Sequence, residues 1–186
     1  GEWGHNPLPW PRQYSADAQT LNAEAAVARA AIISPIYAHK PYCAQYVDSL
    51  HDNEYTGTAC YCGKFGCLET WISGTGFEND YHRRSGRRLK GAEIVARVGA
   101  GDADAEQTLD CYIDRLARGL ASVVDVIDPD AIVLGGGMGN IAQLYEALPE
   151  KLALYCFSSS LRTHIVPPRH GDSSGVRGAA WLGRNQ

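Results

Sequence analysis

The second half of the chain places apolar residues at helical spacing. An i, i+3, i+4 stripe between Asp102 and Ile127 predicts one long helix, and the sequence Asp128-Pro129-Asp130 predicts its end. The stripe consists of Leu109, Ile113, Leu116, Leu120, Val123, Val124 and Ile127. Shorter helices are predicted at Gly91 to Val98 and at about 68–83, where the sequence Ser73-Gly74-Thr75-Gly76 is expected to introduce a bend.

Two apolar segments indicate strands. Ala131 to Leu134 is a continuous apolar run, which is typical of a buried strand, and 162–167 is a second candidate. Helices are predicted between them, at about 141–153, and after them, over 173–182, where small residues share one face. Because strands alternate with helices, the sequence predicts an α/β fold with a partly parallel sheet.

The beginning of the chain has a weaker pattern. Residues 1–13 are rich in Pro, Gly and Trp without a period, and they predict a structured loop or the end of a strand. A short Ala-rich helix is predicted at 19–33, ending before Pro35. The irregular sequence of 34–59 predicts a loop.

Composition narrows the class of protein. The 186 residues are 45% apolar and 20% charged with a net charge of −4, which fits a globular protein and excludes a disordered chain, a collagen-like repeat and a coiled coil. A pI of about 5.8 argues against nucleic-acid binding, which usually requires a basic surface. No apolar run approaches the ~18 residues of a membrane span and no signal peptide opens the chain, so we expect a cytoplasmic protein.

Three of the six cysteines, Cys60, Cys62 and Cys67, lie within eight positions. Gly63 and Gly66 between them give the backbone freedom that lets three sulfurs converge. Without a secretory signal, such a cluster favours metal ligation in a reducing compartment over disulfide formation. Three thiolates need one further ligand, usually an imidazole, to close a tetrahedral zinc site.

Three histidines are candidates for the fourth ligand: His5, His39 and His51. Proximity favours His51, whereas sequence context favours His5, which lies in a compact segment between Trp and Pro residues. Loop length does not exclude His5, because lengthening the connection adds only ~1 kcal/mol of closure cost, against about 10–16 kcal/mol supplied by structural zinc. His39 is interpreted as a surface side chain. The residues alone leave His5 and His51 open.

The glycine triplet Gly135-Gly136-Gly137 follows a predicted strand and precedes a helix. Such a loop allows the backbone to approach a nucleotide closely, although a tight turn between strand and helix would use the same residues. The basic residues Arg83-Arg84 and Arg87-Arg88-Lys90 could attract phosphates, but a solvated helix end is the simpler interpretation.

Four segments together resemble the sugar kinases of the ROK family (repressor, open reading frame, kinase): GEWGH at the start, CYCGKFGCLE, DPDAIVLGGG and HGDSSGVRGAAWL. The opening GEWGHNPLPW and the stretch SGTGFENDYHRRSGRRLKG look most like the bacterial fructokinase, or manno(fructo)kinase, branch. The resemblance covers residues 1–13 and 59–182. It implies ATP-dependent phosphorylation of the terminal hydroxyl of a hexose, in an actin-like (ribonuclease H-like) two-lobed fold.

The resemblance also implies roles for individual residues. The zinc ligands would be His5, Cys60, Cys62 and Cys67, and the sugar hydroxyls would contact Glu2, His5 and Glu69. The glycines Gly135, Gly136 and Gly137 would lie near the adenosine of Mg-ATP, with Gly74 and Thr75 as weaker candidates for the same pocket. An ionised carboxylate only accepts hydrogen bonds, which suits it to a ring of hydroxyl donors. The zinc would be structural, with no open coordination position for chemistry.

The resemblance assigns residues 1–186 to the C-terminal portion of such a kinase, with a zinc knuckle at 59–69 and an unusual insertion at 14–58. The phosphate-binding loop and the carboxylate base would belong to an N-terminal lobe upstream of Gly1. No catalytic residue is therefore assigned in this chain, and the chain alone is expected to be inactive. We expect the full-length protein to be a homodimeric fructokinase. A sugar-responsive repressor of the same family and a non-catalytic zinc-stabilised domain are the alternatives.

Overall fold

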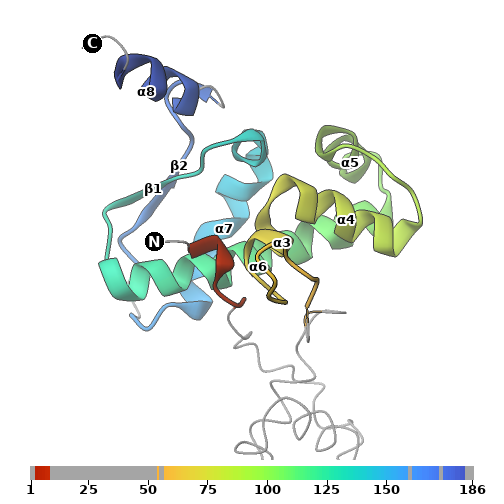
Figure 1. Cartoon of the computed structure of the whole chain (residues 1–186), viewed down its shortest axis with the longest axis horizontal. Helices are drawn as coiled ribbons and strands as arrows, with labels where there is room; N and C mark the ends of the chain where they lie inside the picture. The colour runs from red at the N-terminus through yellow and green to blue at the C-terminus, as the bar shows by residue number, and fades with distance from the viewer. Residues whose placement is uncertain (1–2, 9–53, 55–56, 159–160, 172–173, 183–186) are drawn as a thin grey trace, which may run out of the picture. The chain divides into compact units, whose positions relative to one another are not determined.

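A computed structural model of the chain describes residues 3–8, 54, 57–158, 161–171 and 174–182 (Figure 1). The chain divides into two compact units, Gly1–Leu68 and Glu69–Gln186. The helix predicted at 19–33 lies outside the described residues, as does most of the loop predicted at 34–59.

In the first unit, the opening segment pairs with the cysteine-rich turn through its backbone. A short 3₁₀ helix at Trp3–His5 is followed by two main-chain hydrogen bonds. The Leu8 amide donates to the Gly66 carbonyl at 3.2 Å, and the Leu68 amide donates to the Asn6 carbonyl at 2.9 Å. Because these bonds satisfy backbone groups on both segments, they fix the opening segment beside the turn.

The second unit is built mainly of helices (Figure 1). Its elements in chain order are α3 (Glu69–Ile72), α4 (Gly74–Ser85), α5 (Gly91–Val98), α6 (Ala103–Ile127), β1 (Ala131–Val133), a 3₁₀ turn (Gly137–Asn140), α7 (Ala142–Tyr155), β2 (His164–Val166) and α8 (Ser174–Leu182). The helices predicted at 91–98, 102–127, 141–153 and 173–182 are confirmed to within one or two residues at each end. Among the described residues, no helix has the length and apolar character needed to cross a membrane.

The helix predicted at 68–83 is divided in two at Ser73. The Ser73 side chain accepts a hydrogen bond from the Gly76 amide at 3.0 Å and caps the start of α4. A cap of this kind pairs an amide that the first turn of a helix leaves without a partner. The expected bend is therefore a complete break, which makes Gly74 the first residue of a new helix.

Helix α6 forms the centre of the second unit and is contacted by α3, α4, α5 and α7. Asp102 caps its start by accepting a hydrogen bond from the Ala105 amide at 3.2 Å. Because neighbouring helices cover α6, every residue of 111–120 is buried, including the polar ones. Ile127, the last residue of the predicted stripe, is 68% exposed, so the stripe extends past the core at this end.

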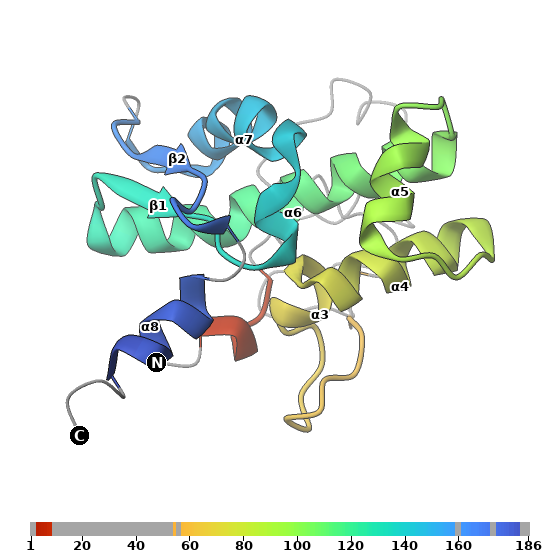
Figure 2. The ribbon, with the colours of Figure 1, turned by 90° about the horizontal axis from the view of Figure 1, so that it is seen from above.

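Strands β1 and β2 pair in parallel, with Ala131 opposite His164 and Val133 opposite Val166, and α7 connects them (Figure 2). Helix α7 contacts both α6 and β2, and it buries an apolar stripe at four-residue spacing. The stripe consists of Leu144, Leu148 and Leu152. The predicted partly parallel sheet is confirmed, as is the strand within 162–167.

The prediction that Ala131 to Leu134 is buried is wrong. Ala131 is exposed and Val133 is 57% exposed. Among the described residues the sheet has two strands, so β1 is an edge strand and its side chains are not enclosed. The side chains described in α8, from Gly175 to Leu182, are exposed as well.

A buried ion pair joins α4 to α6. Asp80 contacts Arg115 at 2.7 Å, and the two side chains are 5% and 1% exposed. Arg83 and Arg84 contact the same carboxylate. The Arg115 guanidinium also lies 4.6 Å from the centre of the Trp71 ring, where the aromatic face attracts the cation. A buried charge held in this way fixes the position of α4 on α6.

Burial alone would raise the pKa of Asp80, but Arg115 and the two neighbouring arginines more than offset this effect and hold the pKa below its usual value. A carboxyl group whose pKa is lowered in the folded state stabilises that state when it is ionised. The contribution is complete above the pKa of the unfolded chain and is lost as the pH falls through the lower pKa of the folded protein.

A second buried ion pair lies within α6, where Arg118 contacts Asp114 at 3.0 Å. The Tyr155 hydroxyl of α7 donates a hydrogen bond to the same Asp114 carboxylate. The buried charges of α6 are therefore paired, which removes most of the cost of placing them in the core.

We predict that Asp80→Asn lowers the free energy of unfolding by about 3–5 kcal/mol at neutral pH, because the buried Arg115 loses its charged partner. Guanidinium chloride unfolding followed by circular dichroism measures the loss. The difference between the two proteins should narrow as the pH falls below the usual aspartate range, since the wild type then loses the same contribution.

Asp110→Asn is the matched control, because Asp110 is an exposed carboxylate on α6. Its effect is expected to stay within about 0.5 kcal/mol. A loss from Asp80→Asn no larger than that of the control would contradict the role given to the buried pair.

Candidate functional site

The cysteine-rich turn is shaped by its backbone before any side chain is considered. Ala59 and Phe65 form an antiparallel bridge, and the Cys60 amide donates to the Lys64 carbonyl at 2.8 Å. Gly63 and Gly66 have φ values of 84° and 68°. Few residues other than glycine adopt this left-handed conformation at low cost, so the two glycines allow the turn to close and its sulfurs to converge.

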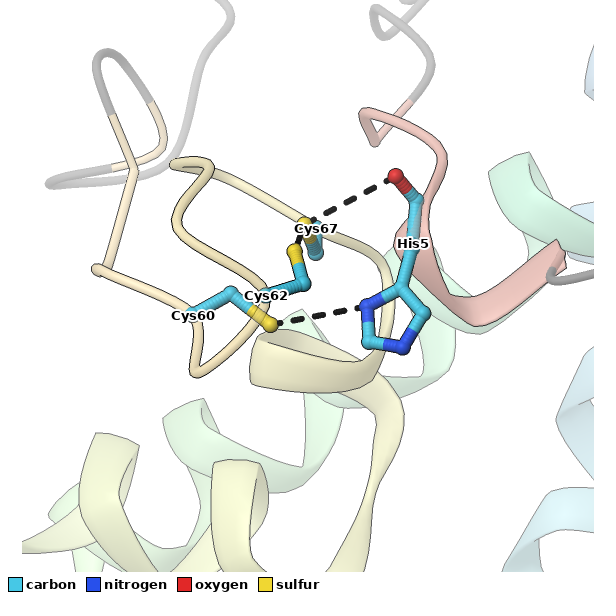
Figure 3. Close-up of side chains that lie close together, drawn as sticks. All are labelled: His5, Cys60, Cys62 and Cys67. Atoms are coloured by element: carbon cyan, nitrogen blue, oxygen red, sulfur yellow. Dashed lines mark hydrogen bonds between the residues drawn. The ribbon is translucent and has the colours of Figure 1, made fainter.

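Four possible ligand atoms converge at this turn (Figure 3). Those of His5, Cys60, Cys62 and Cys67 all lie within 4.8 Å of one another. The Cys62 and Cys67 sulfurs are 3.6 Å apart, and the Cys60 sulfur is 3.6 Å from His5 Nδ1. The sequence-predicted residues are thus brought together by two segments distant in the chain.

The two separations of 3.6 Å fit a tetrahedral zinc ion. Zinc binds sulfur at about 2.3 Å and imidazole nitrogen at about 2.0–2.1 Å, so ligands at tetrahedral corners lie about 3.8 Å apart for two sulfurs and about 3.5 Å apart for sulfur and nitrogen. A disulfide between Cys62 and Cys67 would instead need a bond of about 2.05 Å. The donor set of three thiols and one imidazole is also the one that zinc prefers.

The thiols of the cluster differ in acidity. A hydrogen bond from the Lys64 backbone lowers the pKa of the Cys62 thiol to about 7. Burial raises the pKa of the Cys67 thiol to about 11, and its sulfur lies 3.7 Å from the His5 carbonyl, to which it donates. A metal ion binds thiolates, so a bound ion would displace the protons that the metal-free thiols retain.

Of the other residues of the predicted metal and sugar sites, the structure describes Glu69. His39, His51 and Glu2 are outside the described residues. Glu69 is the first residue of α3, is partly exposed, and follows the candidate ligand Cys67 by two positions.

The second unit contains a cavity of about 680 Å³. It is lined by helices α4 and α5, the 3₁₀ turn and the start of α7. Its lining residues include Gly74, Glu78, Gly91, Gly137, Met138 and Ala142. The Glu78 carboxylate accepts hydrogen bonds from the Gly91 amide at 3.1 Å and from Lys90 Nζ at 3.2 Å. A volume of this size is typical of a pocket for a small ligand.

The cavity includes some of the predicted nucleotide residues. Gly74 and Gly137 line it, whereas Gly135, Gly136 and the exposed Thr75 are not among its lining residues. The sequence reasoning missed Met138 and the wall formed by α5. These residues carry no motif of their own, and only the fold brings them to the cavity.

Gly139 was also missed, although it follows the glycine triplet by two positions. A side chain there would place its Cβ 2.0 Å from the Leu134 carbonyl oxygen, so the turn requires glycine. The Tyr145 hydroxyl donates to the Gly139 carbonyl at 2.6 Å and links this turn to α7. In the sequence, the requirement for glycine at position 139 is indicated only by the spacing of glycines in Gly-Gly-Gly-Met-Gly.

Four of the five basic residues from Arg83 to Lys90 form ion pairs within the second unit. Arg83 and Arg84 contact Asp80, Arg87 contacts Asp102 at 3.3 Å, and Lys90 contacts Glu78. These ion pairs agree with the interpretation of the run as a helix end instead of a phosphate site.

Comparison with known proteins matches residues 1–186 to the ROK family. The N-acetyl-D-glucosamine kinases of Aliivibrio salmonicida and Pasteurella multocida are 40% and 42% identical to this chain over 123 residues, 66% of its length. Those residues cover 41% and 40% of the two relatives, so the match spans about two fifths of their length.

Solved structures of the same family share the fold. A ROK hexokinase from Thermus thermophilus aligns with a TM-score of 0.60 and 32% identity over 70% of this chain and 45% of its own. A ROK glucokinase from Streptomyces griseus, in complex with glucose and AMPPNP, gives a TM-score of 0.64 at 22% identity over 70% and 48%. A ROK transcriptional regulator, a homologue of the E. coli MLC protein, gives 0.52 at 20% identity over 60% and 31%.

For the metal site we predict one zinc ion per chain, lost in His5→Ala and retained in His51→Ala, because among the residues that the structure describes His5 brings its imidazole to the three sulfurs. Purification without added chelator, followed by elemental analysis, gives the zinc content of the wild type and of both variants. Equal loss from both variants would contradict the assignment of His5.

Proposed function

Because this chain belongs to the ROK family and has its actin-like ATPase type of α/β fold, we propose that it is part of a carbohydrate kinase. The kinase transfers the γ-phosphoryl group of Mg-ATP to a hexose hydroxyl. The observation that carries the proposal is the identity of about two residues in five with N-acetyl-D-glucosamine kinases over 123 residues. The candidate zinc site and a cavity of nucleotide size support it.

In this proposal, residues 1–186 are the C-terminal portion of the kinase, with 14–58 as an insertion and 59–69 as the zinc knuckle. The hexose hydroxyl oxygen attacks the γ-phosphorus, the bond to the ADP oxygen breaks, and a carboxylate base accepts the hydroxyl proton. That base and the phosphate-binding loop belong to another part of the protein, so no residue of this chain is assigned as the base.

Zinc held by His5, Cys60, Cys62 and Cys67 has four protein ligands, and its contribution is to stabilise the fold and position residues. Glu2 lies three residues before one ligand, and Glu69 lies two residues after another. We assign these carboxylates, with His5, to the hydroxyls of the sugar. A missing or inverted hydroxyl would leave a desolvated acceptor unpaired, which is the basis of discrimination between sugars.

The adenosine of ATP is assigned to the cavity of the second unit. Gly74 and Gly137 leave its wall open to close approach, and Met138 supplies an apolar surface. Gly135, Gly136 and Thr75 stay predictions for the same nucleotide, in the loop before the cavity and in the first turn of α4.

Two observations bear on the identity of the sugar, and they favour different sugars. The opening motif predicts fructose, whereas the curated relatives at 37–42% identity are named N-acetyl-D-glucosamine kinases. Because the similarity to the N-acetyl-D-glucosamine kinases extends over 123 residues, we propose N-acetyl-D-glucosamine as the first candidate substrate and fructose as the second. Homodimer formation stays a prediction from the family resemblance.

The complete gene product that contains this chain is expected to phosphorylate a hexose in a panel of N-acetyl-D-glucosamine, fructose, mannose and glucose, measured by ADP release. The 186-residue chain alone is expected to show negligible turnover, because this proposal assigns the base to another part of the protein. Robust turnover by the chain alone would contradict this division of roles. Sugar-dependent DNA binding without turnover would favour the repressor alternative.

A second prediction concerns the nucleotide cavity. Ala142→Trp is expected to raise the KM of the complete gene product for ATP at least tenfold, because Ala142 lines the cavity and an indole would fill it. Ala153→Trp is the matched control, since Ala153 is exposed on the same helix away from the cavity. Equal KM values for ATP in both variants would contradict the placement of adenosine.

A further inference from the structure

We propose that Glu78 selects ribonucleotides in the cavity of the second unit, by accepting hydrogen bonds from the two neighbouring hydroxyls of the ribose. The inference rests on the carbohydrate kinase proposed above, and it names the part of the nucleotide that this side chain recognises. Gly74 and Glu78 both line the cavity and lie four positions apart on α4, so they share one face of the helix. The carboxylate is therefore one helical turn from the glycine assigned to the nucleotide.

Glu78 supplies the charge in the wall of the cavity. Of the lining residues that the structure describes, it is the only one with an ionisable side chain, and the others are glycines, apolar residues and the amides Asn140 and Gln143. Ligand pockets are typically apolar, with a few polar groups that fix the orientation of the ligand. An amide both donates and accepts, whereas an ionised carboxylate only accepts. We therefore expect Glu78 to select the donor groups of a ligand.

Two hydrogen bonds hold the Glu78 carboxylate in place. Its Oε1 accepts from the Gly91 amide at 3.1 Å, and its Oε2 accepts from Lys90 Nζ at 3.2 Å. An ionised carboxylate has about four lone-pair sites, so each oxygen keeps room for a further donor. The Lys90 side chain is 81% exposed, and such a pair in water is weak enough to yield to a ligand. The backbone amide of Gly91 then keeps the carboxylate in position.

The parts of ATP differ in what they offer a carboxylate. The phosphates are anionic and repel it, and the adenine carries its donors on one amino group. The ribose has hydroxyls on two adjacent carbons, and these can donate together to the two oxygens of one carboxylate in charge-assisted hydrogen bonds. The ribose is therefore the part that best matches Glu78. A 2′- or 3′-deoxynucleotide would leave one of the two acceptors without its donor.

The experiment supplies the complete gene product with a saturating hexose and compares ATP, 2′-deoxyATP and 3′-deoxyATP as phosphoryl donors. Release of the nucleoside diphosphate gives kcat and KM for each. The wild type is expected to show a KM about tenfold higher for each deoxy analogue than for ATP, the low end of the range for a hydrogen bond to a charged group, because Glu78 is 27% exposed. This ratio of KM values tests the recognition of the ribose without any substitution.

Glu78→Ala removes the carboxylate. Its KM is expected to rise more for ATP than for either analogue, so that the ratio falls below about twofold. Loss of support for α5 alone would raise all three KM values together and leave the ratio unchanged. Glu93→Ala is the matched control, because Glu93 also accepts a hydrogen bond at the start of α5, from the Lys90 amide at 2.8 Å, but is exposed and does not line the cavity. It is expected to keep the wild-type ratio.

The outcomes separate this inference from the proposed function. If the wild type phosphorylates a hexose with equal KM values for ATP and the deoxy analogues, the role of Glu78 is wrong and the kinase stands. A wild-type ratio that persists in Glu78→Ala, or that falls equally in Glu93→Ala, would also overturn the role, since another group would then recognise the ribose. If no hexose is phosphorylated with any of the three nucleotides, the proposed function is wrong and the inference falls with it.

Discussion

The arrangement of the described part of the first unit depends on the convergence of the His5 imidazole with three cysteine sulfurs. Among its described residues few apolar side chains are buried, and Tyr61 and Phe65 on the turn are 81% and 63% exposed. Structural zinc supplies about 10–16 kcal/mol in small peptides, so a zinc ion held by these four residues would stabilise the described part of the unit. The main-chain hydrogen bonds that the Asn6 carbonyl accepts and the Leu8 amide donates bring His5 to the turn, where the four candidate ligand atoms lie within 4.8 Å of one another.

The second unit is organised by buried charge around α6. The pair Asp80–Arg115 fixes α4, and the α4 residue Glu78 then holds the start of α5 through the Gly91 amide. The cavity walls are parts of these same helices. The polar contacts inside the unit therefore fix the position of the cavity walls. The leucines of α7 supply the apolar packing on α6.

The features that could be predicted from the sequence are those with a local cause. The period of α6, its end before Asp128 and the turn with Cys60, Cys62 and Cys67 all depend on residues near one another in the chain. The choice between His5 and His51 could not be made from composition, because it depends on backbone pairing between two distant segments. The family resemblance named His5, and the structure brings His5 to the sulfurs.

Other features have no local cause and were missed. The ion pair of Asp80 and Arg115 joins residues 35 positions apart, and neither position shows a pattern that marks it as buried. Val133 was predicted to be buried because its segment is apolar, but the burial of a strand depends on the number of strands beside it. The need for glycine at Gly139 follows from its approach to the Leu134 carbonyl, which only coordinates reveal.

X-ray absorption at the zinc edge of the purified chain reports which atoms surround the bound ion. We expect three sulfurs at about 2.3 Å and one nitrogen at about 2.0–2.1 Å around each ion. A shell of oxygen and nitrogen alone, or four sulfurs without nitrogen, would show that His5 and the three cysteines do not share a zinc ion.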